Sequence, residues 1–182
     1  MEQKDYKLEI ANLLLRKNYH VRGLAKELGL NHMTISRKIR ELYKENAVDF
    51  RQEGKNKTFF LKKTIEAKIL AFSAEQYKLH KALGKYPQLR RIIEKMQEDR
   101  RIKLAILFGS YAKGLAKKDS DIDVYVETEN YSIKKELGLI DSKLSIKIGK
   151  YDRESNLMKE IEKDHVIIKG VEEYYDRNKV FR

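Results

Sequence analysis

The stretch Ile102-Lys-Leu-Ala-Ile-Leu-Phe-Gly-Ser110 decides the fold of the C-terminal part of this chain. Residues 102–108 form an apolar run of strand length, and Gly109-Ser110 interrupts it and opens a short helix-forming segment over 111–116. A glycine lets the backbone approach a ligand closely, and a serine at a helix start leaves N–H groups free to meet an anion. The stretch therefore predicts a strand that ends at a phosphate-binding turn.

Two aspartates follow within Ser120-Asp-Ile-Asp-Val124. Asp121 and Asp123 alternate with apolar residues, which predicts a strand with both carboxylates on one face. Carboxylate oxygens are preferred ligands of Mg²⁺, which bridges protein to phosphate. The pattern therefore predicts that Asp121 and Asp123 hold one or two Mg²⁺ ions beside the turn.

This combination of strand, Gly-Ser turn, short helix and Asp-x-Asp strand resembles the minimal nucleotidyltransferases of the DNA-polymerase-beta superfamily, over roughly residues 88–175. The resemblance implies transfer of a nucleoside monophosphate, AMP from ATP in the leading interpretation, to a hydroxyl on a protein or small molecule. It implies that Asp121 and Asp123 are catalytic. It also implies an antitoxin role against a partner ribonuclease, and nucleotide binding by Gly109, Ser110, Lys113 and Ser120. Lys147, a cation on the following strand, would either contact a phosphate of the nucleotide or partly offset the charge of the metal.

The chain departs from this family at the next core strand, where members usually carry a third aspartate. Apolar residues occupy one face of the segment 143–148, so Ser145 and Lys147 are expected on the site face, and neither is a carboxylate. Nucleotide binding tolerates this change more readily than fast catalysis does. The alternative function is therefore a transcriptional regulator whose nucleotidyltransferase fold senses ATP or another nucleotide without turnover.

Composition narrows the class of protein. A length of 182 residues suits two small domains, and no apolar run approaches the roughly 20 residues of a membrane span. The absence of cysteine excludes disulfides, thiolate catalysis and cysteine zinc sites. The charged N-terminus lacks the apolar region of a signal peptide, so we expect a cytoplasmic protein with no membrane association.

Positive charge is concentrated at the start of the chain. The net charge is +12, and residues 1–63 hold 15 Lys and Arg against 8 Asp and Glu. Such a bias favours an acidic partner, most often nucleic acid. A generally lysine-rich, soluble surface would also account for it.

The N-terminal third predicts three helices and a hairpin. Apolar residues recur at helical spacing over 6–17 and 21–28, the second run ends at Gly29, and Asn31 can cap a third helix that extends to Glu45. Residues 48–61 alternate around a basic tip, as in a β-hairpin. This order resembles a winged helix-turn-helix module, which we place at 1–63.

The resemblance implies binding of duplex DNA. A protein-interaction role for the same fold is the alternative. The third helix would be the recognition helix, with base contacts and phosphate contacts divided by side-chain type. We expect His32, Thr34, Ser36 and Arg37 to face the major groove, and Lys38, Arg40, Lys55 and Lys57 to meet phosphates.

Residues 64–86 are expected to form a linker, with a helix over 64–83 that Gly84 ends. Its apolar seam would either join two copies in a homodimer through residues 65–83 or pack on the chain's own catalytic domain. The predicted fold class is α+β, with a small α/β nucleotidyltransferase fold containing a mixed sheet at 87–182. The seam comprises Ile65, Ile69, Phe72, Leu79 and Leu83, with Gln76 as one polar position.

Overall fold

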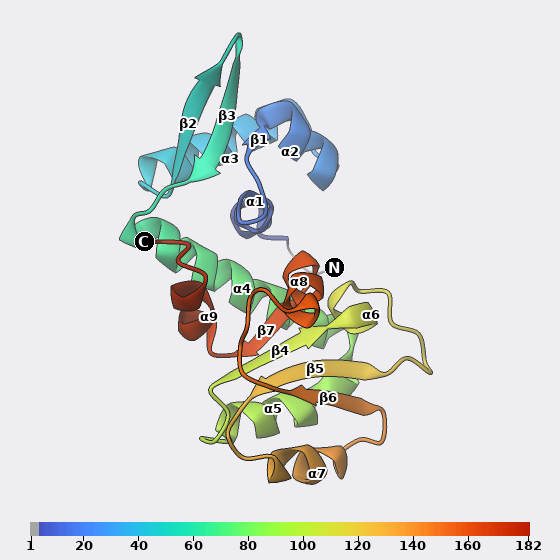
Figure 1. Ribbon diagram of the computed structural model, residues 1–182. Helices are drawn as coiled ribbons and strands as arrows, with labels where there is room; N and C mark the ends of the chain where they lie inside the picture. Colours follow the sequence, from blue (N-terminus) through green and yellow to red (C-terminus); the bar gives the residue numbers. More distant parts are fainter. Residues whose placement is uncertain (1–3) are drawn as a thin grey trace. The chain divides into compact units, whose positions relative to one another are not determined.

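The computed structural model describes residues 4–182 and forms two compact units (Figure 1). The first comprises the described residues up to Tyr77 together with Lys179–Arg182, and the second is Lys78–Asn178. Helix α4 (Ile65–Lys85) contributes its first part to one unit and its last part to the other.

Helix α4 continues through Gly84, so the prediction that this glycine ends the helix was wrong. The helix stops one residue before Tyr86, which has φ −129° and ψ 74°. Steric contact with the ring of a following proline disfavours helical backbone, and Pro87 comes next. The proline, rather than the glycine, therefore ends the helix.

The first unit contains three helices and a small antiparallel sheet. Gly29, in the left-handed conformation at φ 63°, joins α2 to α3, and Asn31 Oδ1 accepts a hydrogen bond from Thr34 N at 2.8 Å as the N-cap of α3. The sheet order is β1-β3-β2. This is the winged helix-turn-helix fold, as predicted. Its elements are α1 (Tyr6–Leu14), β1 (Tyr19–His20), α2 (Val21–Leu28), α3 (His32–Lys44), β2 (Val48–Glu53) and β3 (Asn56–Leu61).

The helix-turn-helix rests on a core to which every helix of the unit contributes. The first helix ends at Leu14 rather than at residue 17, because the chain then turns into β1, where Tyr19 pairs with Phe59 of the wing. This short strand was not predicted. Burial of the apolar stripes is the main stabilising contribution. The core residues are Ile10, Leu14, Leu24, Ile35, Ile39, Leu42, Val48 and Phe59.

The second unit is a mixed four-stranded sheet of order β6-β5-β4-β7 with helices on both faces (Figure 1). Strands β5 and β6 are parallel, and β4 is antiparallel to both of its neighbours. The predicted α+β class with a mixed sheet is confirmed. The elements are the 3₁₀ helix η1 (Pro87–Leu89), α5 (Arg90–Glu98), β4 (Leu104–Phe108), α6 (Gly109–Ala112), β5 (Ile122–Glu127), α7 (Ser132–Gly138), β6 (Leu144–Ile148), α8 (Asn156–Lys163), β7 (Val166–Lys169) and α9 (Val171–Arg177).

Alternate strand residues build a core on each face of this sheet. Ala105, Leu107, Val124 and Ile146 belong to the core that also holds apolar residues of α5 and α7. Tyr125 faces the other way, and its hydroxyl donates a hydrogen bond to Gly149 O at 2.8 Å. Burial raises the pKa of Tyr125, so the phenol stays protonated. The sheet is thus covered on both sides.

The apolar seam of α4 is divided between two environments. Leu79 is buried and Leu83 packs against it in the core of the second unit, whereas Ile65 and Ile69 are 65% and 58% exposed. The C-terminal half of the predicted dimer seam therefore packs on the chain's own domain.

Of the helices in the described part of the chain, none combines the length and the apolar character needed to cross a membrane.

We expect Gly170→Ala to lower the free energy of unfolding by about 2 kcal/mol or more. Gly170 has φ +82°, and an added Cβ would lie 2.4 Å from Lys103 O, a backbone atom that cannot move aside cheaply. Urea denaturation followed by circular dichroism measures this. The control is Gly138→Ala, where a Cβ meets nothing within 4 Å and the change should stay within about 1 kcal/mol. Equal losses in both variants would contradict the argument.

Candidate functional site

The Gly-Ser turn lies against the second aspartate of the Asp-x-Asp segment. Phe108, the last residue of β4, pairs with Asp123 of β5, and Gly109 then turns away with φ +68°. A Cβ at position 109 would lie 2.6 Å from Asp123 Oδ2. Only glycine fits both the backbone conformation and this space. The turn and the carboxylate therefore converge at one end of the sheet.

The two aspartates are held differently. Asp123 is a partly buried strand residue, whereas Asp121 is exposed and directly precedes β5. Helix α6 is shorter than the helical segment expected over 111–116, because it ends at Ala112 and the chain turns at Gly114 with φ +69°. A compact loop therefore separates the turn from the aspartates.

A magnesium–nucleotide complex fits this set of donors. Within residues 4–182 there is no group of three or more His, Asp and Glu side chains that could hold a metal by itself. Mg²⁺, however, is usually held by one or two carboxylates together with substrate phosphates. Asp121 and Asp123 supply two carboxylates, and the absence of a Cβ at position 109 lets the second of them lie against the turn, which matches that requirement.

The register of β6 places a serine beside the aspartate. Asp123 pairs with Ser145, and Tyr125 pairs with Lys147, across two parallel strands. Paired residues of adjacent parallel strands project from the same face. The expectation that Ser145 and Lys147 stand on the site face is therefore correct. Lys147 is exposed and lies two pairs farther from the turn than Ser145.

Two predicted nucleotide contacts already have partners within the chain. Lys113 Nζ lies 3.7 Å from Glu160 Oε1 of α8. The pKa of Glu160 is lowered, chiefly by a hydrogen bond from Lys163 and secondarily by Lys113. Ser120 Oγ accepts a hydrogen bond from Lys117 N at 2.9 Å. Ser120 thus shapes the loop that leads to Asp121, and Lys113 would have to leave Glu160 to meet a phosphate.

Residues at the end of α4 hold the loop and were missed from the sequence. Lys85 Nζ donates to Gly114 O at 2.6 Å, and Tyr86 Oη accepts from Ala116 N at 3.1 Å. The Tyr86 ring also packs edge-on against Tyr111, with centroids 4.8 Å apart. These hydrogen bonds join residues 29 and 30 positions apart. No local pattern marks such pairs.

Comparison with protein families agrees with this geometry. The model of a nucleotidyltransferase domain matches residues 89–179, which is half of the chain. The chain belongs to the nucleotidyltransferase domain family. The matched range includes the Gly-Ser turn, both aspartates and Ser145, and it confirms the resemblance seen in the sequence. A search of curated proteins found no match.

The nucleotidyltransferase domain has a hollow of about 700 Å³ at the end of β5 that lies away from Asp123. Glu127 is buried there and accepts hydrogen bonds from Arg177 at 2.5 Å and from Tyr151 N at 3.3 Å. Its carboxylate is thereby compensated within the protein. None of the nucleotide-site residues predicted from the sequence lies in this hollow, which is lined by Glu127, Lys150, Tyr151, Asp152, Arg153 and Arg177.

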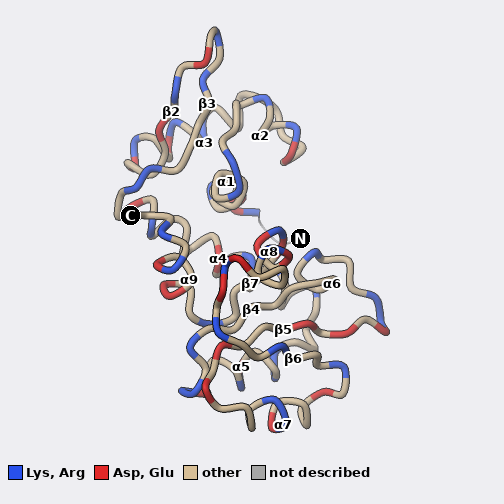
Figure 2. The backbone as a smooth tube through the Cα atoms, in the orientation of Figure 1, with Lys and Arg blue, Asp and Glu red and all other residues tan. Residues whose placement is uncertain are grey.

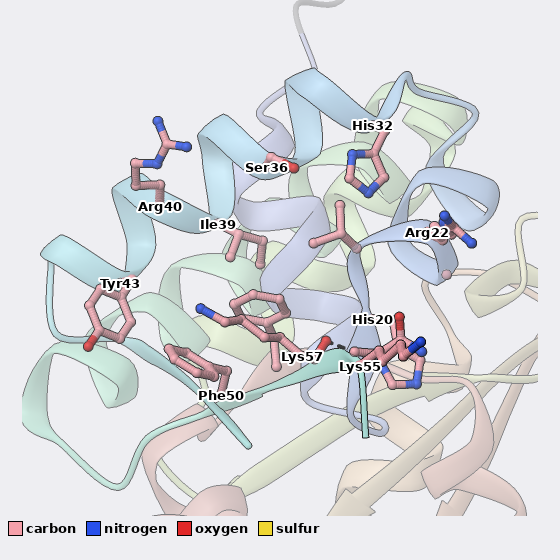
Figure 3. A pocket seen from close by; sticks show the side chains of 14 residues that line it. His20, Arg22, His32, Ser36, Ile39, Arg40, Tyr43, Phe50, Lys55 and Lys57 are labelled. Carbon is pink, nitrogen blue, oxygen red and sulfur yellow. Dashed lines mark hydrogen bonds between the residues drawn. The ribbon is translucent and has the colours of Figure 1, made fainter. Parts of the chain in front are cut away.

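The predicted DNA contacts of the first unit fall into two groups. A hollow of about 630 Å³ lies between α3 and the β2–β3 wing (Figure 3). The structure brings five of the predicted contacts together around it, namely His32, Ser36, Arg40, Lys55 and Lys57. Thr34, Arg37 and Lys38 of α3 do not line it.

The charges around this face are mixed. Figure 2 shows basic residues on α2, α3 and the wing, with acidic residues between them. Lys38 Nζ pairs with Glu41 at 3.0 Å, which offsets part of its charge, whereas Arg37 and Arg40 are exposed. Arg40 is therefore better placed than Lys38 to meet a phosphate.

Three solved structures match the N-terminal part at low similarity. The homodimeric winged helix-turn-helix DNA-binding domain of Mb0332 from Mycobacterium bovis, a possible ArsR-family transcriptional regulator, is 24% identical, with TM-score 0.36, over 38% of this chain and 65% of that one. Reduced HlyU from Vibrio cholerae is 22% identical, with TM-score 0.37, over 41% and 78%. The adhesin competence repressor AdcR from Streptococcus pyogenes is 21% identical, with TM-score 0.40, over 52% and 68%.

Proposed function

We propose that this protein is a DNA-binding nucleotidyltransferase that transfers AMP from ATP to a hydroxyl on a protein or small molecule. The observation that carries the proposal is the contact of Gly109 with Asp123, because a Cβ there would lie 2.6 Å from the carboxylate oxygen. A phosphate on the turn would then lie beside the Asp121–Asp123 pair. A turn that binds phosphate next to two carboxylates is the arrangement that phosphoryl transfer requires, and it contributes no apolar contact to the core.

Each group in the site has a proposed role. The backbone at Gly109 and Ser110 would hold the β- and γ-phosphates, with Lys113 and Lys147 as further phosphate contacts. Mg²⁺ held by Asp121 and Asp123 would neutralise charge on the phosphates when bound. The acceptor oxygen would form a bond to the α-phosphorus while the bond to the leaving pyrophosphate breaks.

A second candidate function is nucleotide sensing without turnover. The observation that favours it is Ser145, which pairs with Asp123 where the family usually has a third carboxylate. A general base typically contributes about 10²–10⁴-fold to a rate. Without one, a bound nucleotide would persist long enough to act as a signal to the DNA-binding unit.

The winged helix supports the DNA-binding part of the proposal through its basic residues on α3 and the wing. A homodimer would use the exposed Ile65 and Ile69 of α4, since Leu79 and Leu83 are occupied by the chain's own core. An antitoxin role would require a partner ribonuclease as the AMP acceptor. An adjacent ribonuclease-like gene would support it.

We expect Asp121→Asn and Asp123→Asn each to weaken Mg²⁺-dependent ATP binding at least about tenfold, because loss of even a hydrogen-bond partner of a metal ligand typically costs about 10–100-fold. The amide removes the negative charge that the metal requires while keeping the side-chain shape. Calorimetric titration of the full chain with ATP and Mg²⁺ measures the affinity. Asp119→Asn, an exposed carboxylate in the same loop, is the control and should bind as wild type. Unchanged affinity in both test variants would remove the metal assignment.

We expect Ser145→Asp to accelerate AMP transfer by up to about 10²–10⁴-fold, because it restores a carboxylate beside Asp123. Release of pyrophosphate from ATP in the presence of the acceptor reports the rate. Ser142→Asp, exposed in the turn before β6, adds the same charge outside the strand and should change little. If the wild-type protein transfers AMP rapidly and Ser145→Asp slows the transfer, the protein is not a sensor without turnover, and Ser145 does not occupy the place of the family's third carboxylate.

Binding of the full chain to duplex DNA should weaken steeply with salt. Six phosphate contacts would give a slope of about −5 in log K against log salt. Lys57→Ala should weaken preferred and random sites alike, whereas Arg37→Ala should weaken the preferred site more. Fluorescence anisotropy measures the affinity for the preferred site and for random sites. The control is Lys103→Ala, which removes an exposed lysine of the second unit and should leave both affinities unchanged. No binding at low salt would leave the module as a protein-interaction domain.

A further inference from the structure

The hollow between α3 and the wing combines positive charge with aromatic surface. Arg22 of α2, Arg40 of α3, and Lys55 and Lys57 of the wing all line it. Among the described residues that line it, none is Asp or Glu. Its volume of about 630 Å³ falls within the range of pockets that bind small ligands. The ligand it suits is therefore anionic.

The carboxylate of Glu53 in the wing is hydrogen-bonded within the wing itself. Glu53 Oε2 accepts a hydrogen bond from Thr58 Oγ1 at 2.7 Å. Thr58 Oγ1 also lies 2.9 Å from Nδ1 of His20, a residue that lines the hollow. Glu53 Oε2 is therefore hydrogen-bonded within the wing, and Glu53 does not line the hollow.

Aromatic rings form one wall of the hollow. Phe50 and Phe59 have centroids 5.9 Å apart, and Tyr43 and Phe50 have centroids 6.0 Å apart. Lys57 Nζ lies 4.0 Å from the Phe50 centroid, a cation–π contact that places charge directly on the aromatic wall. Tyr43 is 50% exposed, so a large apolar ring faces solvent at the edge of a cationic hollow.

The rings and cations are arranged in sequence along the hollow. In Figure 3, Tyr43 and Phe50 lie toward one end, His20, Arg22 and Lys55 lie toward the other, and Lys57 lies between them. Arg40 projects from α3 above Tyr43 and Phe50, at the same end of the hollow as these rings (Figure 3). Cations thus lie at both ends of the hollow.

We propose that this hollow binds an unpaired nucleotide of a nucleic-acid strand, with its base stacked on Tyr43 and its flanking phosphates met by Arg40 on one side and by Arg22 and Lys55 on the other. The inference rests on the proposed nucleic-acid binding by the same unit. In duplex DNA the bases stay stacked and present only their edges to a recognition helix, so no base face is free to stack on Tyr43. A free nucleotide carries all its phosphates on one side. Only a strand places phosphates on both sides of an exposed base.

The test compares how a labelled oligothymidylate of ten nucleotides and a labelled duplex bind to the full chain, measured by fluorescence anisotropy. The buffer contains a metal chelator, so that neither probe binds the proposed ATP site through a metal ion. We expect Tyr43→Ala to weaken oligothymidylate binding by about tenfold and duplex binding by less than about twofold. Tyr43→Phe keeps the ring and should restore binding to wild-type strength. Tyr131→Ala, which removes a 72% exposed tyrosine from the second unit, is the matched control and should have no effect.

The outcomes separate this inference from the proposed function. Equal losses for strand and duplex, or no loss for either, would overturn the inference while leaving DNA binding intact. Failure of the wild-type chain to bind either probe at low salt would overturn the proposed DNA binding itself. AMP that displaces oligothymidylate at similar concentrations in wild type, and that loses affinity in Tyr43→Ala, would identify a free nucleotide as the ligand and overturn the strand assignment.

Discussion

The close approach of Gly109 to Asp123 is the constraint on which the candidate active site depends. It requires β4 and β5 to pair with Phe108 opposite Asp123, and it requires a left-handed backbone at the next residue. A side chain at position 109 would occupy space 2.6 Å from a carboxylate oxygen. The lack of a side chain is therefore what lets the Asp123 carboxylate lie directly against the turn.

Keeping that turn in place requires support from outside the sheet. The loop after α6 reverses at Gly114, whose carbonyl accepts a hydrogen bond from Lys85, and Tyr86 holds Ala116. Both residues lie at the end of α4, the helix that also follows the wing in the chain. Since α4 contributes to both compact units, the loop of the candidate nucleotide site is held by an element that the winged-helix unit shares.

The candidate sites of the two units carry charges of opposite sign. At the proposed nucleotide site, two carboxylates would need a cation before a phosphate could approach them. The hollow of the winged helix has four Lys and Arg residues and no Asp or Glu among its lining residues in the described chain. Anions can therefore bind the hollow directly. Ser145 beside Asp123 reduces the negative charge of the nucleotide site relative to a site with three carboxylates. Binding of nucleotide is less affected by that difference than turnover is.

The sequence alone determined the local features of this protein. Alternation around Asp121 and Asp123, the interruption at Gly109, and the cap at Asn31 each depend on residues within a few positions. The structure has the turn and the cap where they were predicted, and a strand that includes Asp123 but begins one residue after Asp121. The face on which Ser145 and Lys147 lie also followed, because a strand with one apolar face turns that face to the core. The pairing of Ser145, rather than Lys147, with Asp123 was not predicted and is set by the register of the two strands.

Only the tertiary structure decided which distant residues meet. Lys85 and Tyr86 reach partners 29 and 30 positions away, and the seam of α4 was divided so that Leu79 became buried while Ile65 stayed exposed. The aromatic wall of the hollow likewise joins Tyr43 of α3 to Phe50 of the wing. Helical or strand periodicity shows that a face is apolar, but which surface covers that face depends on the packing of the whole chain.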